Sequence, residues 1–180
     1  GTGIDPKDAK IFEGNQMCVS AGWVDMRVGS RDPGFEHKED LESVRNAAAH
    51  GGFTEIVLLP NSSPVVHSKD TLNYLKNSDP NALVKLHVAA SVTRKAEGVD
   101  FTEMIDLHTT GAIGFTDGDH PVQNADLFLK TILYLLPLNA LLMNRPEDRQ
   151  LTLFGQMHEG VSSTLTGMKG MPSLAEEMML

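Results

Sequence analysis

Polar side chains that could take part in chemistry follow the short apolar runs of this chain. They are guanidinium groups, carboxylates, amides and hydroxyls, and in chain order they are Arg27, Arg31, Asn61, Ser91, Thr93, Asp117, Asp119, Asn144 and Arg145. If the apolar runs are parallel strands, their carboxyl ends meet at one edge, which is where ligands bind in barrels of β/α units. The pattern therefore predicts that these groups converge on one edge of a sheet.

Histidine, the usual nitrogen ligand of zinc, does not stand at any of these expected strand ends. The chain has seven histidines, which are His37, His50, His67, His87, His108, His120 and His158. We expect most of them on the surface or satisfied within the core. His120 is the best-placed candidate metal ligand because it lies near Asp117. Arginine cannot take the place of imidazole on a metal, because guanidinium keeps its proton and offers no lone pair.

The hydrophobic pattern predicts five strands that alternate with four helices. The strands are expected at residues 17–28, 54–59, 83–90, 112–115 and 138–143, and the helices at 35–50, 68–77, 101–109 and 123–135. Strands that alternate with helices indicate a parallel sheet with right-handed crossovers. A doubly wound sheet and a partial TIM barrel share this pattern, so periodicity alone leaves both open.

Composition sets limits on the class of protein and on its partners. The chain has 180 residues, of which 41% are hydrophobic and 22% charged, which is typical of a globular protein with a real core. Its net charge of −9 argues against nucleic acid and anionic membranes as partners. The one cysteine, Cys18, excludes an internal disulfide and fits a reducing, cytoplasmic compartment.

The first expected strand and its loop contain Gly22, Asp25, Arg31, Pro33 and Gly34 at fixed spacing. This spacing resembles the pattern Gly-x-x-Asp-x-His-x-His-x-Arg-Glu-Pro-Gly of the dihydroorotases, a family of cyclic amidohydrolases. In that family both histidines bind zinc and the arginine holds the substrate carboxylate. The two histidine positions are occupied by Arg27 and Gly29. The resemblance therefore implies Arg31 as a substrate-binding residue and the loss of the first metal-binding pair.

Further motifs extend the resemblance from about residue 21 to residue 180. Residues 58–64 resemble the family's Met-Pro-Asn-Thr-x-Pro, in which the asparagine, here Asn61, helps to bind the substrate carboxylate. Residues 115–119 resemble a run whose aspartate bridges two metals, which implies Asp117 as the remaining metal position. After the fifth strand the family has a metal-binding histidine, and here that position is Arg145. No cofactor is therefore expected for this copy, although active relatives use zinc.

The resemblance selects the TIM-barrel interpretation over the doubly wound sheet. We expect one incomplete domain that covers the first half to two-thirds of a metal-dependent-hydrolase barrel, because a complete barrel needs about 250 residues. Residues 1–16 are expected to lead in, 17–144 to hold the five strands with their crossovers, and 145–180 to form a loop and the start of the next helix. The chain would then be part of a longer protein.

Three functions follow from the resemblance and from the missing ligands. The first is a catalytically inactive dihydroorotase homologue with a structural or regulatory role in pyrimidine biosynthesis, homo-oligomeric and associated with aspartate transcarbamoylase. The second is an active zinc dihydroorotase, which interconverts dihydroorotate and carbamoyl aspartate. The third is a module that binds an acidic metabolite through Arg31 and Asn61, although both residues could equally be structural. We also expect Arg27 or Arg145 to form an ion pair with Asp117 in the vacated pocket.

Overall fold

Five parallel strands form one sheet in a computed structural model that describes residues 10, 14–16, 18–79 and 81–179. The spatial order of the strands is β1-β2-β3-β4-β5, the same as their order in the chain. In a doubly wound sheet the order of the strands reverses at an inner strand, so their spatial order differs from their order in the chain. The sequential order seen here is that of a curled half-barrel. The strands are β1 (Trp23–Val28), β2 (Phe53–Leu58), β3 (Lys85–Ala90), β4 (Gly114–Phe115) and β5 (Leu141–Leu142).

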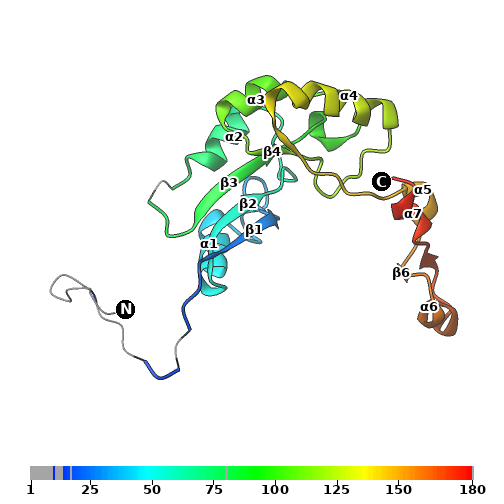
Figure 1. Ribbon diagram of the computed structural model, residues 1–180, viewed down its shortest axis with the longest axis horizontal. Coiled ribbons are helices and arrows are strands. Elements are labelled where there is room, and N and C mark those ends of the chain that lie inside the picture. The colour runs from blue at the N-terminus through cyan, green and yellow to red at the C-terminus, as the bar shows by residue number, and fades with distance from the viewer. Residues whose placement is uncertain (1–9, 11–13, 17, 80, 180) are drawn as a thin grey trace.

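Four helices connect these strands and cover one face of the sheet (Figure 1). They are α1 (Leu41–His50), α2 (Lys69–Lys76), α3 (Met104–Thr110) and α4 (Ala125–Leu135). Side chains cap three of them at their first turn: Asp40 accepts a hydrogen bond from the Ser43 amide, Ser68 caps α2, and Asn124 caps α4. Such caps satisfy amide groups that have no partner within the helix, and each stabilises a helix by about 1 kcal/mol. The predicted alternation of strands and helices is confirmed.

The core lies between the helices and the face of the sheet that they cover. Residues opposite each other on neighbouring parallel strands point to the same side, and the register pairs Leu58 with Val88 and Ala90 with Phe115 on the covered face. Fully or almost fully buried helical side chains meet them there, namely Leu41, Val44, Leu72, Leu75, Met104, Leu107, Leu127 and Leu135. Burying one such side chain contributes about 1.5–3 kcal/mol, so this layer holds the strand ends in place.

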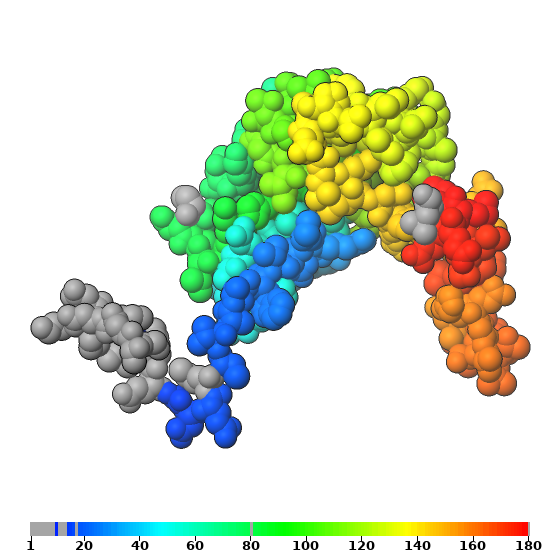
Figure 2. Space-filling model, in the orientation of Figure 1, coloured from blue at the N-terminus to red at the C-terminus, as the bar shows by residue number. Residues whose placement is uncertain are grey.

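The two edge strands carry apolar side chains that stay exposed. On β1, Trp23, Val24 and Met26 are 62%, 55% and 47% exposed, and on β5 Leu141 is 43% exposed. Figure 2 shows the segment that contains β1, in blue, at the surface of the molecule. Edge strands of this kind present unpaired backbone groups together with apolar surface.

Several expected boundaries were wrong. Residues 18–22 of the first expected strand have no regular structure, and Met17 lies outside the described residues. The helix expected from residue 35 begins at Leu41, because residues 31–38 form turns in which the Phe35 amide donates to the Arg31 carbonyl. Part of the strand expected at 138–143 belongs to a 3-10 turn, η3 (Leu136–Leu138), and only residues 141–142 pair with β4.

Residues 145–180 hold more structure than the expected loop and helix start. Three short helices and a two-stranded parallel ladder lie beyond β5, to one side of the sheet (Figure 1). They are α5 (Arg149–Thr152), β6 (Met157–His158), α6 (Val161–Thr166), β7 (Gly170–Met171) and α7 (Leu174–Glu177). Another 3-10 turn, η2 (Arg94–Ala96), follows β3. Within the part of the chain that the structure describes, no helix has the length and apolar character needed to cross a membrane.

Candidate functional site

Asp117 is the buried centre of the edge at which the strands end, which we call the rim. Its side chain is 3% exposed and accepts two hydrogen bonds from Thr93 after β3, from the amide to Oδ1 at 2.9 Å and from Oγ1 to Oδ2 at 2.5 Å. Burial raises the pKa of the Asp117 carboxyl, while the Thr93 hydrogen bonds act to lower it. Both oxygens of this carboxylate are therefore engaged by the protein.

Asn61, which follows β2, holds the loop after β4 through the backbone. Its Nδ2 donates to the Asp117 carbonyl at 3.1 Å, and its Oδ1 accepts from the Asp119 amide at 3.0 Å. Gly118 lies between these two contacts with a φ of +64°, and a Cβ there would lie 1.7 Å from Asn61 Oδ1. Only glycine therefore fits, both for the backbone angle and for the space. Asn61 thus has a positioning role at the rim beside the substrate-binding role that the resemblance implies.

Two arginines meet at Asp119 rather than at Asp117. Arg27 Nη2 lies 3.2 Å from Asp119 Oδ1, and Arg145 Nη1 donates to the Asp119 carbonyl at 3.2 Å. Arg145 also pairs with Glu147 at 2.8 Å. No ion pair to Asp117 occurs within the described residues, so the expected Arg27 or Arg145 pair with Asp117 is wrong. The physical reason is that Asp117 is buried against Thr93, while the exposed carboxylate of Asp119 is accessible to Arg27 and that of Glu147 to Arg145.

The remaining predicted residues stand apart from this network. Arg31 is exposed, and within the described chain its side chain has no hydrogen bond or ion pair. The next residue, Asp32, is buried and accepts a hydrogen bond from the Tyr74 hydroxyl at 2.8 Å, a contact that sequence reasoning did not anticipate. Ser91 donates from its buried hydroxyl to the Val66 carbonyl at 3.2 Å and is structural.

The side chains at the rim do not fit a zinc centre of the dihydroorotase kind. The positions that the resemblance assigns to metal-binding histidines hold two guanidinium groups and a glycine, and none of these can donate an electron pair from its side chain. His120 is exposed, and its Nδ1 accepts a hydrogen bond from Arg149 Nη2 at 3.0 Å. Among the residues that the structure describes, no group of three or more His, Cys, Asp or Glu side chains is arranged to hold a metal.

What the rim offers instead is fixed positive charge around a rigid loop. Arg27 and Arg145 come from β1 and from the loop after β5, so the sheet brings together two guanidinium groups that are far apart in the sequence. Guanidinium groups bind carboxylates with directed hydrogen bonds. Each guanidinium already has a carboxylate partner, Asp119 for Arg27 and Glu147 for Arg145, so an anion at the rim would bind by sharing or displacing one of these partners.

Comparison with known proteins gives one consistent result. The sequence profile of the family described as Dihydro-orotase-like matches residues 16–179. The chain is 34% identical over 180 residues to a dihydroorotase of Pelotomaculum thermopropionicum and 37% identical over 179 residues to one of Syntrophus aciditrophicus. These alignments include 100% and 99% of this chain but 42% of each relative, so the chain spans less than half of their length.

A solved structure supports the architecture. The L-hydantoinase (dihydropyrimidinase) from Arthrobacter aurescens aligns with a TM-score of 0.60 and 17% identity, over 73% of this chain and 30% of the hydantoinase. At that identity the likeness concerns the fold alone. It agrees with the sequential order of the strands, and the expected partial TIM barrel is confirmed.

Proposed function

Because this chain belongs to the dihydro-orotase-like family, we propose that it is a catalytically inactive dihydroorotase-like protein with a structural or regulatory role in pyrimidine biosynthesis. The observation that carries the proposal is the exchange of imidazole for guanidinium or hydrogen at Arg27, Gly29 and Arg145. Opening a cyclic amide by hydrolysis needs an activated hydroxide, which in metallohydrolases a bound metal generates by lowering the pKa of water to about 7.

The engagement of Asp117 supports the same proposal. Each oxygen of the Asp117 carboxylate already accepts a hydrogen bond from Thr93, so the protein itself takes up part of the capacity with which this group could bridge metals.

Zinc content and turnover test the proposal together. We expect purified chain to hold well under one zinc per molecule by plasma mass spectrometry and to show no turnover of dihydroorotate or carbamoyl aspartate above the uncatalysed rate. About two zinc ions per chain with measurable turnover would establish the alternative, an active zinc dihydroorotase.

A restored histidine pair makes the test sharper. No atom lies within 4 Å of a Cβ built at Gly29, so a larger side chain has room there. The variant Arg27→His/Gly29→His is expected to bind zinc more tightly than the unmodified chain in a competition assay. Arg27→Gln/Gly29→Gln serves as the matched control, because it changes the same positions without adding imidazole.

A second candidate function is the binding of an acidic metabolite. It is favoured by the two guanidinium groups that meet at Asp119 and by the exposed Arg31 nearby in sequence. Calorimetry with dihydroorotate, orotate and carbamoyl aspartate tests it. Binding that weakens in Arg31→Ala and Asn61→Ala, but not in Lys130→Ala on α4, would support this function. If none of the three compounds produces a heat of binding, the structural role is favoured instead.

For the structural role we propose aspartate transcarbamoylase as the partner, together with self-association of this chain in the cytoplasm. The exposed apolar residues of β1 and β5 provide surface for such contacts. Co-expression with the cognate transcarbamoylase followed by size-exclusion chromatography tests the partner. Elution of the two proteins as separate peaks would count against it.

A further inference from the structure

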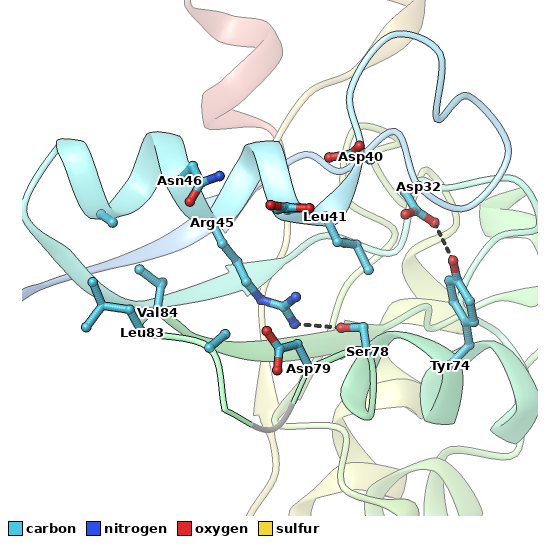
Figure 3. A pocket seen from close by; sticks show the side chains of 13 residues that line it. Asp32, Asp40, Leu41, Arg45, Asn46, Tyr74, Ser78, Asp79, Leu83 and Val84 are labelled. Carbon is cyan, nitrogen blue, oxygen red and sulfur yellow. Dashed lines mark hydrogen bonds between the residues drawn. The ribbon is translucent and has the colours of Figure 1, made fainter.

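A cleft between α1 and α2, on the helix-covered side of the sheet, holds a buried arginine. It consists of two adjoining hollows of about 580 and 420 Å³, and both are lined by Arg45, Asp79, Ala82 and Val84. We call this the α1–α2 cleft. Figure 3 shows the larger hollow, in which the Arg45 side chain extends from α1 toward Ser78 and Asp79.

The charge of Arg45 has no counter-ion in the structure. The residue is 9% exposed, its Nη2 donates to the Ser78 hydroxyl at 2.6 Å, and its Nε is buried without a hydrogen-bond partner. No ion pair of Arg45 occurs within the described residues. Burying a charge without an opposite charge costs several kcal/mol, so proteins normally supply a carboxylate or leave the place to a ligand.

The smaller hollow adds further positive charge. Lys76 and Lys85 also line it, and Asp79 is the one carboxylate among its lining residues. Lys76 Nζ donates to the Thr110 carbonyl at 2.9 Å, which positions the ammonium group without neutralising it. Lys85 lies opposite Glu55 on β2, so the cations left for the hollow are Arg45 and Lys76, against the single carboxylate of Asp79.

We propose that the smaller hollow of the α1–α2 cleft binds a small oxyanion, such as a phosphate group or a dicarboxylate, between Arg45 and Lys76. The guanidinium supplies directed donors and the ammonium supplies a point charge, which is the combination that recognises such groups. The larger hollow does not favour the anion, because Asp32, Asp40, Glu42 and Asp79 line it. The site is separate from the rim and does not depend on the proposed function.

Titration of the full chain with inorganic phosphate, in low-salt buffer at pH 7, tests the proposal. We expect saturable binding by calorimetry with a Kd on the order of 1 mM. Arg45→Gln should weaken it at least about tenfold, and Lys76→Gln by about threefold, since each removes a charge-assisted contact. Succinate in a parallel titration distinguishes a dicarboxylate from a phosphate preference, and chloride at equal ionic strength measures non-specific screening.

Lys130→Gln on α4 is the matched control, because it removes one positive charge outside both the cleft and the rim. It should bind phosphate as the unmodified chain does. If circular dichroism shows that Arg45→Gln does not fold, Lys76→Gln on the helix surface decides the question. Absence of saturable binding, or equal weakening by Lys130→Gln, would overturn the proposal.

Discussion

At the rim, the buried Asp117 and the exposed Arg27 and Arg145 each meet a partner from another strand or loop, whereas in the α1–α2 cleft the buried guanidinium of Arg45 meets a single hydroxyl. The two regions belong to the same half-barrel and differ in how charge is compensated. The rim satisfies its charges internally, so little is left there that demands a ligand. The cleft leaves a charge unpaired, and an unpaired buried charge points to something that completes it.

The largest effect should come from removing the central acceptor of the rim. Asp117→Ala leaves the Thr93 amide and hydroxyl without their partner in a buried place, so we expect the free energy of unfolding to fall by about 3 kcal/mol. Chemical denaturation measures this loss. Asp119→Ala is the control, because its exposed side chain should contribute under about 0.5 kcal/mol. Equal losses in both variants would mean that the rim is not centred on Asp117.

Asn61→Ala should lower the free energy of unfolding by somewhat less than Asp117→Ala does. The variant removes both side-chain hydrogen bonds to the loop after β4, each worth about 1 kcal/mol, so we expect a loss of about 2 kcal/mol. Amide hydrogen exchange at Gly118 and Asp119 should rise at the same time, because the Asp119 amide loses its acceptor. Unchanged exchange at these two amides would show that Asn61 does not hold the loop.

In the α1–α2 cleft, removing the buried charged group should stabilise the chain rather than destabilise it. Arg45→Met keeps much of the side-chain volume and removes the unpaired charge, so we expect the free energy of unfolding to rise by about 1 kcal/mol in buffer without phosphate. Added phosphate should stabilise the unmodified chain and leave this variant unchanged. A loss of more than about 2 kcal/mol would mean that Arg45 has a carboxylate partner in solution, with Asp79 the nearest candidate.

The pH dependence of the free energy of unfolding tests the buried carboxyl of Asp117 at the rim. Because burial raises the pKa of Asp117 in the folded chain, its protonated form favours folding. That contribution is fully present below the pKa of about 3.9 in the unfolded chain, and it is lost as the pH rises through the raised folded pKa. We therefore expect the stability of Asp117→Asn relative to the unmodified chain to grow as the pH rises from acid to neutral. A difference that shrinks with rising pH would contradict the assigned direction of the shift.

The smallest effect is expected at the surface of the rim. The Arg27 and Asp119 side chains are 53% and 63% exposed, so their ion pair is screened by water and salt. Arg27→Ala should change the free energy of unfolding by less than about 0.5 kcal/mol, and the change should vanish at high salt. A larger loss that persists in salt would place Arg27 in the supporting structure of the loop.

The sequence predicted the β/α alternation because each core strand and helix carries a clear apolar pattern, and the half-barrel was predicted from the family resemblance. It could not predict the partners at the rim. Asp117 binds Thr93, which is 24 residues away, and Asn61 binds the loop 56 to 58 residues further on. Such contacts are set by strand register and loop shape rather than by any local pattern. The expectation that an arginine would seek Asp117 failed because burial, which periodicity does not reveal for a loop carboxylate, favoured a neutral donor.

The short elements after residue 145 were missed for another reason. Strands of two residues and helices of four to six are too short for a hydrophobic period to appear. They are held by contacts between residues far apart in the segment, such as the hydrogen bond from the Asp148 amide to the Ala175 carbonyl at 2.8 Å. The α1–α2 cleft could not be predicted from the sequence either. An arginine on an amphipathic helix is expected at the surface, and only the position of the neighbouring helix shows that it is buried.

Trp23 on the open edge of β1 has a practical consequence. It is the chain's one tryptophan, and 62% of its surface is in contact with solvent. The indole emission of this protein therefore reports on one place, the free side of the first strand. A blue shift on mixing with another protein, or on raising the concentration of the chain, would register the covering of that edge without any label.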